Sequence, residues 1–309
     1  MAEGRVLVTG ASGFVGPHVV AALSKAGWSL RLAARRPMPS PEGIETVVVG
    51  DLAERIDWSE VLRGIDHVVH MAGLAHAGPG LDEALYRRIN TEATLELARA
   101  ATAAGVRRFV YLSSIKALSG VFDGPPLAED APPAPTDVYG RSKWAAEQGL
   151  AALGLDWVAL RPVLIYGPGV KANMAALLKL AQSPLPLPLG GLKAPRSLLA
   201  VENLADAILF ALSPACPARQ SYTVADREPI SVAEMLAAMR AGLGRGAGLL
   251  PVPEAWLRLV ARLAGREETF FKLAGSLVAR PERLLRAGWR PPAETQAGLA
   301  RLAASARAG

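Results

Sequence analysis

Hydrophobic and polar positions follow two alternating patterns along the first two-thirds of the chain. Short apolar runs without polar alternation are typical of strands buried on both faces of a parallel sheet, and they cover residues 5–9, 29–33, 46–49, 67–70, 108–113, 156–161 and 221–224. Between them, apolar residues recur at helical spacing over residues 14–26, 58–62, 81–104, 139–153 and 201–212. This alternation predicts an α/β fold, a doubly wound parallel sheet with helices on both faces.

Two segments break this alternation. Residues 168–196 contain a helical pattern and then a proline-rich run over residues 183–188, which can be neither a helix nor a central strand. Beyond about Pro229 the pattern is helical over residues 232–243, 254–264 and 281–287. We predict a sheet domain of residues 1–167 plus 197–228. Residues 168–196 and 229–309 would form a smaller, mostly helical lobe over the carboxyl ends of the strands, where open α/β sheets bind ligands.

The loop after the first predicted strand carries three glycines. From Thr9 to Gly16 it reads Thr-Gly-Ala-Ser-Gly-Phe-Val-Gly and opens directly into a predicted helix. Glycines at this spacing allow a tight turn, close approach of the backbone to a pyrophosphate, and close packing of helix on strand. The free N–H groups of the helix would then face the phosphates. The pattern predicts a Rossmann-type dinucleotide site with cofactor contacts from Gly10, Ser12, Gly13, Phe14, Val15 and Gly16.

The end of the second predicted strand bears on the choice of cofactor. NAD-binding proteins place an Asp or Glu about 20 residues past the glycine loop to hold the ribose 2′-hydroxyl, but this strand runs into Ala34-Arg35-Arg36. Two guanidinium groups could hold a 2′-phosphate by charge and paired hydrogen bonds. We therefore expect NADP(H) to be favoured, while NAD(H) stays open if Arg35 and Arg36 form only a solvated turn.

Tyr139 and Lys143 form the strongest candidate for catalysis. Their i, i+4 spacing places a phenol and an ammonium group on one face of a predicted helix. A phenol has a pKa near 10, so it needs a nearby cation to act as a base at neutral pH. The pair therefore predicts proton transfer to or from an alcohol or sugar oxygen.

These motifs together resemble those of the extended short-chain dehydrogenases/reductases, and within them the NAD-dependent epimerase/dehydratase family that acts on nucleotide sugars. The resemblance runs from Arg5 to about Leu299 and includes the Arg-Pro-Val-Leu-Ile-Tyr-Gly-Pro-Gly stretch that begins at Arg161. It implies that Ser114, rather than Ser113, donates a hydrogen bond to the reacting oxygen. The catalytic set that it implies is Ser114, Tyr139, Lys143 and Asn90. The further cofactor contacts that it implies are Asp51, Leu52, Met71, Ala72, Gly73, Tyr139, Lys143 and Pro162.

The resemblance also narrows the reaction. Enzymes of the 4,6-dehydratase branch carry Asp-Glu directly after the catalytic Thr, whereas Ser114 is followed by Ile115-Lys116, which cannot supply an acid and a base to remove water. The same stretch is similar to bacterial UDP-sugar 4-epimerases and 4-reductases, in which residues at the positions of Asn173 and Arg196 contact the diphosphate. Together with Ser114, these two would bind a UDP-sugar. A helix cap and a surface charge are the alternative readings of Asn173 and Arg196.

The expected function is hydride transfer at C4 of a UDP-sugar, by a 4-epimerase or a 4-keto reductase. Galactose epimerases carry an Asn where this chain has Leu164, which leaves the sugar open, and a dissociable NADPH would favour the reductase. An NADP-dependent reductase of a non-nucleotide ketone, such as a steroid, is an alternative. A non-catalytic dinucleotide-binding subunit is another, although it would have no use for the Tyr–Lys pair.

Composition and charge argue against two classes of partner, nucleic acids and membranes. The 309 residues hold 34 Lys and Arg against 28 Asp and Glu, with aromatic residues at 6%. Because the arginines are scattered and stacking rings are few, we expect no nucleic-acid partner. No signal-type segment and no long apolar run occur, so a cytoplasmic location and no membrane partner are expected. Dimerisation is common among proteins of the resembled family, so a homodimer is an expectation from the resemblance alone.

Metal binding is not expected. Cys216 is the single cysteine, which excludes an internal disulfide and a cysteine-rich metal site. His67 and His70 point to opposite faces of a predicted strand, and no carboxylate cluster accompanies them or His76.

One apolar stripe remains without a function. Its members are Trp256, Leu257, Leu259, Val260 and Leu263. Their helical spacing predicts a core or dimer face, ahead of a role at a membrane surface.

Overall fold

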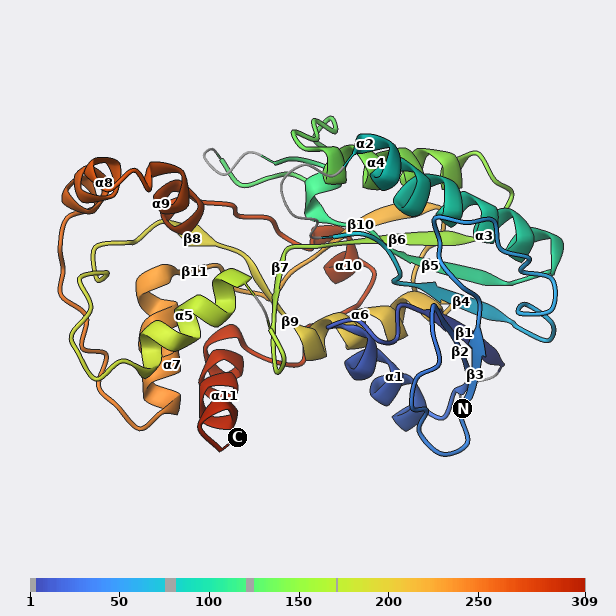
Figure 1. The fold of residues 1–309 in the computed structure, drawn as a ribbon, viewed down its shortest axis with the longest axis horizontal. Helices are drawn as coiled ribbons and strands as arrows, with labels where there is room; N and C mark the ends of the chain where they lie inside the picture. Colours follow the sequence, from blue (N-terminus) through green and yellow to red (C-terminus); the bar gives the residue numbers. More distant parts are fainter. Residues whose placement is uncertain (1–3, 76–81, 121–124, 171, 309) are drawn as a thin grey trace.

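The central feature of the computed structural model is a parallel sheet (Figure 1). The structure describes residues 4–75, 82–120, 125–170 and 172–308, and within them the sheet has seven strands in the order β10-β6-β5-β4-β1-β2-β3. Their bounds are β1 Arg5–Thr9, β2 Ser29–Ala34, β3 Glu45–Val48, β4 His67–His70, β5 Arg108–Leu112, β6 Trp157–Pro162 and β10 Gln220–Val224. The reversal of strand order beside β1 is that of a doubly wound dinucleotide-binding fold, so the predicted fold class is confirmed.

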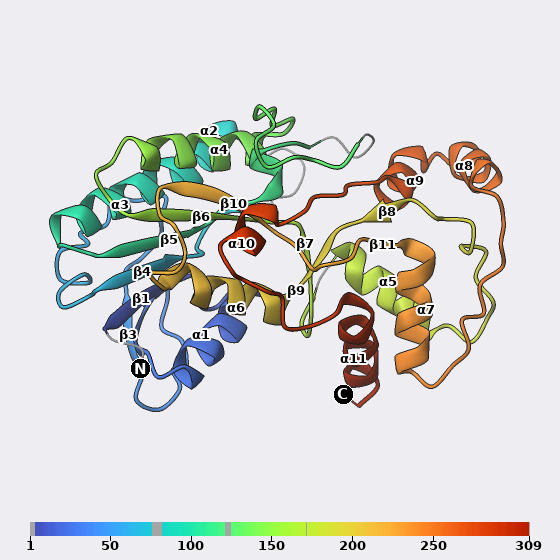
Figure 2. The same ribbon diagram turned by 180° about the vertical axis from the view of Figure 1, so that it is seen from behind.

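Helices cover both faces of the sheet because successive strand residues point to opposite sides. Val6 and Val8 pack with α1 (Gly16–Lys25) and α6 (Val201–Leu212) in one hydrophobic cluster. Leu7 packs with α3 (Ala93–Ala103) and α4 (Val138–Ala151) in a second cluster. Figures 1 and 2 show α1 and α6 below the sheet and α3 and α4 above it. The strands are therefore buried on both faces, as their continuous apolar runs predict.

A third hydrophobic cluster lies beyond one end of the sheet (Figures 1 and 2). It is built mainly by α5 (Ala172–Gln182), α7 (Val232–Gly242) and α11 (Thr295–Ala308), with α8 (Glu254–Leu263) and α9 (Glu267–Ala274) at its margin. Short strand pairs connect it to the sheet: β7 (Leu164–Tyr166) runs parallel to β9 (Leu198–Ala200), and β8 (Pro195–Arg196) antiparallel to β11 (Ile230–Ser231). Helix α10 (Glu282–Arg286) returns to pack beside β10. The exact division into two domains stays a prediction.

Two helix predictions are wrong in detail. Residues 58–62 form one turn, with Leu62 N–H donating to the Trp58 carbonyl at 2.9 Å, and Gly64 at φ 70° ends it before a helix develops. The helix predicted over residues 81–104 is divided into α2 (Glu83–Tyr86), a π-helical segment η1 (Arg87–Glu92) and α3, and residue 81 lies outside the described part. None of the helices in the described residues is long and apolar enough to cross a bilayer.

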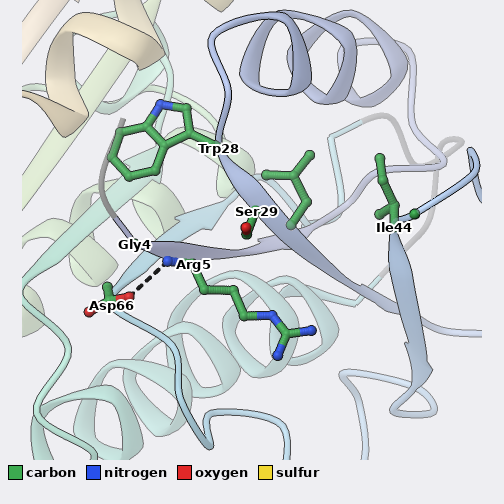
Figure 3. A pocket seen from close by; sticks show the side chains of 8 residues that line it. Gly4, Arg5, Trp28, Ser29, Ile44 and Asp66 are labelled. Carbon is green, nitrogen blue, oxygen red and sulfur yellow. Dashed lines mark hydrogen bonds between the residues drawn. The ribbon is translucent and has the colours of Figure 1, made fainter. Parts of the chain in front are cut away.

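One open hollow lies at the amino ends of the strands, whereas a dinucleotide cofactor would bind at their carboxyl ends. Its volume is about 600 Å³, and it is lined by residues at the amino ends of β1 and β2 together with Asp66. Figure 3 shows the Asp66 carboxylate accepting a hydrogen bond from the Arg5 backbone, at 2.7 Å. The glycine loop follows the carboxyl end of β1, at the opposite edge, so this hollow is separate from the candidate active site.

Candidate active site

The glycine loop is shaped by two close approaches of backbone. Gly10 has φ 78°, and a Cβ there would lie 2.6 Å from the Ala72 nitrogen. A Cβ on Gly16 would lie 2.2 Å from the Ala11 carbonyl oxygen. Gly13 closes the turn by donating to the Gly10 carbonyl at 3.1 Å. Val15 supplies no side-chain cap to α1, so no N-cap side chain occupies the first N–H groups of the helix, which are the groups that would bind the pyrophosphate of a dinucleotide.

The segment after β4 forms the adjoining wall of this loop. Ala72 N–H donates to Thr9 Oγ1 at 3.1 Å, and Met71 N–H to the Thr9 carbonyl at 3.3 Å. A Cβ on Gly73 would lie 2.8 Å from Asn90 Oδ1 and 3.3 Å from Lys143 Nζ. Met71, Ala72 and Gly73 thus connect the glycine loop to the candidate catalytic helix, and a side chain at position 73 would displace Asn90 or Lys143.

His70 is a buried structural residue of this wall. Its ring nitrogens lie 2.7 Å from Thr9 Oγ1 and 2.9 Å from Thr94 Oγ1. Burial, assisted by the charge of Lys143, lowers the pKa of His70 to about 3. Among the described residues, no group of three His, Cys, Asp or Glu side chains is arranged to hold a metal ion; His76 lies outside those residues. Cys216 is fully buried.

Asn90 lies in the π-helical segment η1 and is fully buried. Its Oδ1 accepts from the Leu74 N–H at 2.7 Å, and its Nδ2 donates to the Leu74 carbonyl and to Ser142 Oγ, each at 3.0 Å. The side chain therefore joins the loop after Gly73 to helix α4. Short π-helical segments occur often at functional sites. In this structure Asn90 positions the loop after Gly73 against helix α4; a direct catalytic role stays a prediction.

The structure brings Ser114, Tyr139 and Lys143 together at the carboxyl end of β5. Asp137 caps α4 by accepting from the Gly140 N–H at 2.7 Å, which fixes the start of the helix that carries Tyr139 and Lys143. Lys143 Nζ donates to the Leu112 carbonyl at 2.9 Å and lies 5.9 Å from the centre of the Tyr139 ring. The Ser114 hydroxyl hydrogen-bonds with Tyr139. Tyr139 therefore meets Ser114, the second residue after β5, and Lys143 is held at the last residue of the same strand.

Burial shifts the pKa values of this pair in opposite directions. It raises the pKa of Tyr139 to about 12, against the hydrogen bond with Ser114, which lowers it. It lowers the pKa of Lys143 to about 7, against the charge of Glu147, which raises it. Tyr139 is therefore a proton donor at neutral pH, and a further positive charge near the phenol is needed for it to act as a base.

A buried ion pair, which the sequence did not predict, joins helix α4 to strand β6. Glu147 and Arg161 side chains are 1% and 6% exposed, and Arg161 Nη2 donates to Glu147 Oε2 at 2.6 Å. The same carboxylate accepts from Ser113 Oγ at 2.5 Å and from Ser221 Oγ at 2.6 Å. Ser113 is thus directed away from Tyr139, whereas Ser114 faces it. The available signal was the i, i+4 spacing of Lys143 and Glu147, which places both on one face of α4.

The residues expected near an adenosine ribose lie on the surface beyond β2 and β3. Arg35 and Arg36 are exposed, and Arg35 Nη1 lies 3.5 Å from Asp51 Oδ2. The sequence shows no carboxylate directly at the end of β2, but the fold brings Asp51 beside Arg35. Leu52 adjoins Asp51 and packs partly against the sheet, and Pro162 is buried at the end of β6.

Of the two residues expected to bind the diphosphate, the structure describes the side chain of Arg196 only. Asn173 lies within α5, and its side chain is outside what the structure describes. Arg196 Nη2 donates to the Leu273 carbonyl at 2.5 Å and to the Gly275 carbonyl, and burial lowers its pKa. The surface-charge reading of Arg196 is therefore wrong, because its guanidinium holds the end of α9 against β8.

Comparisons with known proteins agree on one family. The model of the NAD dependent epimerase/dehydratase family matches residues 6–225. A UDP-glucose 4-epimerase of Vibrio cholerae is 35% identical over 95% of this chain and 92% of its own length. A 3 beta-hydroxysteroid dehydrogenase/Delta 5→4-isomerase of Mycobacterium tuberculosis is 32% identical over 75% of this chain and 67% of its own length. The solved structure of MoeE5 in complex with UDP-glucose and NAD covers 99% of both chains, with a TM-score of 0.73 and 26% identity.

Proposed function

Because the chain belongs to the NAD dependent epimerase/dehydratase family, we propose that it transfers a hydride at C4 of a UDP-sugar, as a 4-epimerase or a 4-keto reductase. One observation carries the proposal: Ser114, Tyr139 and Lys143 meet at the carboxyl end of β5, and Gly73 links them to the glycine loop. The similarity to a UDP-glucose 4-epimerase over nearly the whole chain supports the sugar nucleotide.

Tyr139 is the acid and base in this proposal. At neutral pH its phenol is protonated, because its pKa is about 12, so it can protonate the oxygen at C4 when a keto group is reduced. Ser114 donates a hydrogen bond to the same oxygen, and the Lys143 ammonium stabilises negative charge on the phenol. A bound nicotinamide would supply or accept the hydride, and the glycine loop would hold the cofactor's pyrophosphate.

The residues after Ser114 favour hydride transfer without loss of water. Ile115 is buried, and Lys116 Nζ is paired with Asp137 Oδ2 at 2.6 Å. Asp137 is in turn the cap of α4. Neither residue after Ser114 offers the acid and base that elimination across C5 and C6 requires.

The proposal includes a preference for NADP(H), with NAD(H) as the competing cofactor. Arg35 and Arg36 are exposed where a 2′-phosphate would lie, and guanidinium groups bind phosphate oxygens in pairs. NAD(H) is favoured by Asp51, 3.5 Å from Arg35, because its charge opposes a phosphate, and MoeE5 is described with NAD.

A reductase of a non-nucleotide ketone is the second candidate. The observation that favours it is the engagement of Arg196 by the Leu273 and Gly275 carbonyls, which leaves that guanidinium fewer N–H groups for a diphosphate. The similarity to a 3 beta-hydroxysteroid dehydrogenase/Delta 5→4-isomerase is consistent with it. Competition by UDP separates the two candidates, because only a nucleotide-sugar enzyme has a site for it.

The catalytic assignment is tested by removing one hydroxyl. We expect Tyr139→Phe to lose turnover by about a hundredfold or more while retaining NAD(P)H binding, measured by nicotinamide fluorescence. Tyr86→Phe is the matched control, because the Tyr86 and Tyr139 rings lie edge to face with centres 6.4 Å apart, and the proposal gives the catalytic hydroxyl to Tyr139, which bonds Ser114. Full activity in Tyr139→Phe would overturn the assignment.

A further inference from the structure

The outward side of helix α8 is an apolar stripe formed by Trp256, Leu259, Val260 and Leu263. These residues recur at spacings of three and four and so share one face of the helix. Leu263 is 81% exposed and Trp256 61%, and the other two are also exposed. The predicted core role is therefore wrong for these four residues, whereas Leu257, the fifth member of the predicted stripe, packs against the third hydrophobic cluster. Both ribbon views place α8 at the outer corner of the molecule, far from the central sheet (Figures 1 and 2).

A different side of α8 attaches the helix to the protein. Leu257 and Ala261 pack against the third hydrophobic cluster. Arg258 lies 3.6 Å from Glu267 on α9, and its guanidinium lies 4.5 Å from the centre of the Phe271 ring. The stripe is thus free to contact something outside the chain while its helix stays docked.

The charge beside the stripe indicates what that contact is. Arg262 lies one helical turn beyond the paired Arg258, and Arg266 follows the helix; both Arg262 and Arg266 are exposed. Residues 254–267 hold three arginines against two carboxylates, Glu254 and Glu267, so the segment that carries the stripe has a net positive charge. A strongly amphipathic helix with Trp and Leu on one face and arginines beside it is suited to lie among phospholipid headgroups.

We propose that α8 docks the protein on the surface of a bilayer containing anionic phospholipids, with Trp256 and Leu263 inserted at the level of the headgroups. A second copy of the chain is a poorer occupant. A two-fold interface centred on the stripe would bring the arginines of one copy towards those of the other, and like charges brought together at an interface oppose association. The proposal departs from the expectation of no membrane partner, which rested on the absence of a spanning segment.

Co-sedimentation of the full chain with vesicles tests the proposal. The vesicles are phosphatidylcholine alone, or phosphatidylcholine with about one third phosphatidylglycerol, at near-physiological salt. We expect binding to the anionic vesicles only, and a loss of affinity of roughly tenfold or more in Trp256→Ser/Leu263→Ser. Val48→Ser is the matched control, because Val48 is 52% exposed on β3, at the other end of the molecule. It should bind like the wild type.

The competing outcomes are distinct. Absence of wild-type binding to anionic vesicles overturns the proposal, as does binding that the double variant retains. Dimerisation measured by sedimentation velocity, without vesicle binding and abolished in the double variant, would assign the stripe to a second copy instead. Because both substituted side chains are exposed, an unchanged thermal melt should show that the double variant is folded. Quenching of wild-type fluorescence by brominated lipid, reduced in Trp256→Phe, would place Trp256 itself in the bilayer.

Discussion

Neutralising Glu147 should cost much of the stability of the protein. In Glu147→Gln the shape of the side chain is kept, but Arg161, 6% exposed, loses the carboxylate to which its Nε and Nη2 donate. The Ser113 and Ser221 hydroxyls lose their charged acceptor as well. A guanidinium cannot lose its proton in a protein, so the variant buries an unpaired charge, at a cost of about 3–5 kcal/mol. Since domains are stable by about 5–15 kcal/mol, the loss is a large fraction of the total.

Urea unfolding followed by circular dichroism measures this cost from the shift in midpoint at constant slope. The matched control is Glu147→Leu/Arg161→Met, in which both charges are removed. Replacing a whole buried pair by apolar residues is often neutral or stabilising, so the double variant should be more stable than Glu147→Gln. The reasoning would be refuted if Glu147→Gln lay within about 1 kcal/mol of the wild type, or if the double variant were the less stable of the two.

Three further predictions test the site. The pKa of Lys143 is about 7 in the folded protein, so between pH 7 and 9 the unfolded chain binds more protons at this group than the folded protein does. The free energy of unfolding should therefore rise with pH, by up to about 1.4 kcal/mol per pH unit from this group. Urea unfolding of Lys143→Met at several pH values should lack that contribution. Gly10→Ala should weaken NAD(P)H binding by roughly tenfold or more, whereas Gly27→Ala, at φ 84° but with nothing within 4 Å of the added Cβ, should bind normally; equal losses in both would attribute the effect to backbone strain alone. Arg35→Ala should raise the Kd for NADPH by about tenfold and leave that for NADH nearly unchanged, and an equal effect on both cofactors would contradict a 2′-phosphate contact.

The sequence was most informative where one physical requirement dominates. Burial on both faces leaves a continuous apolar run, and β1 and β4 begin and end where such runs predict. The short pairs β7–β9 and β8–β11 were missed because strands of two or three residues leave no periodic pattern. The π-helical segment around Asn90 was also missed, because its apolar spacing differs little from that of an α-helix.

At the site, the sequence predicted contacts between residues close together in the chain but not contacts between distant segments. Tyr139 and Lys143 were identified because one helical turn separates them, whereas the contact between Asp51 and Arg35 depends on how β2 and its neighbours meet in space. Arg196 could be predicted as a cation but not as a donor to the end of α9, which lies 77 residues further along the chain. The stripe on α8 had the correct period, but a pattern in one helix does not specify what covers it.

The most direct test of the central claim is a calorimetric titration of UDP into the protein saturated with NAD(P)H. A UDP-sugar enzyme should bind UDP at one site per chain, and Tyr139→Phe should bind it equally well because the phenol acts on the sugar. Absence of UDP binding, with the cofactor bound, would contradict the claim and favour the reductase of a non-nucleotide ketone.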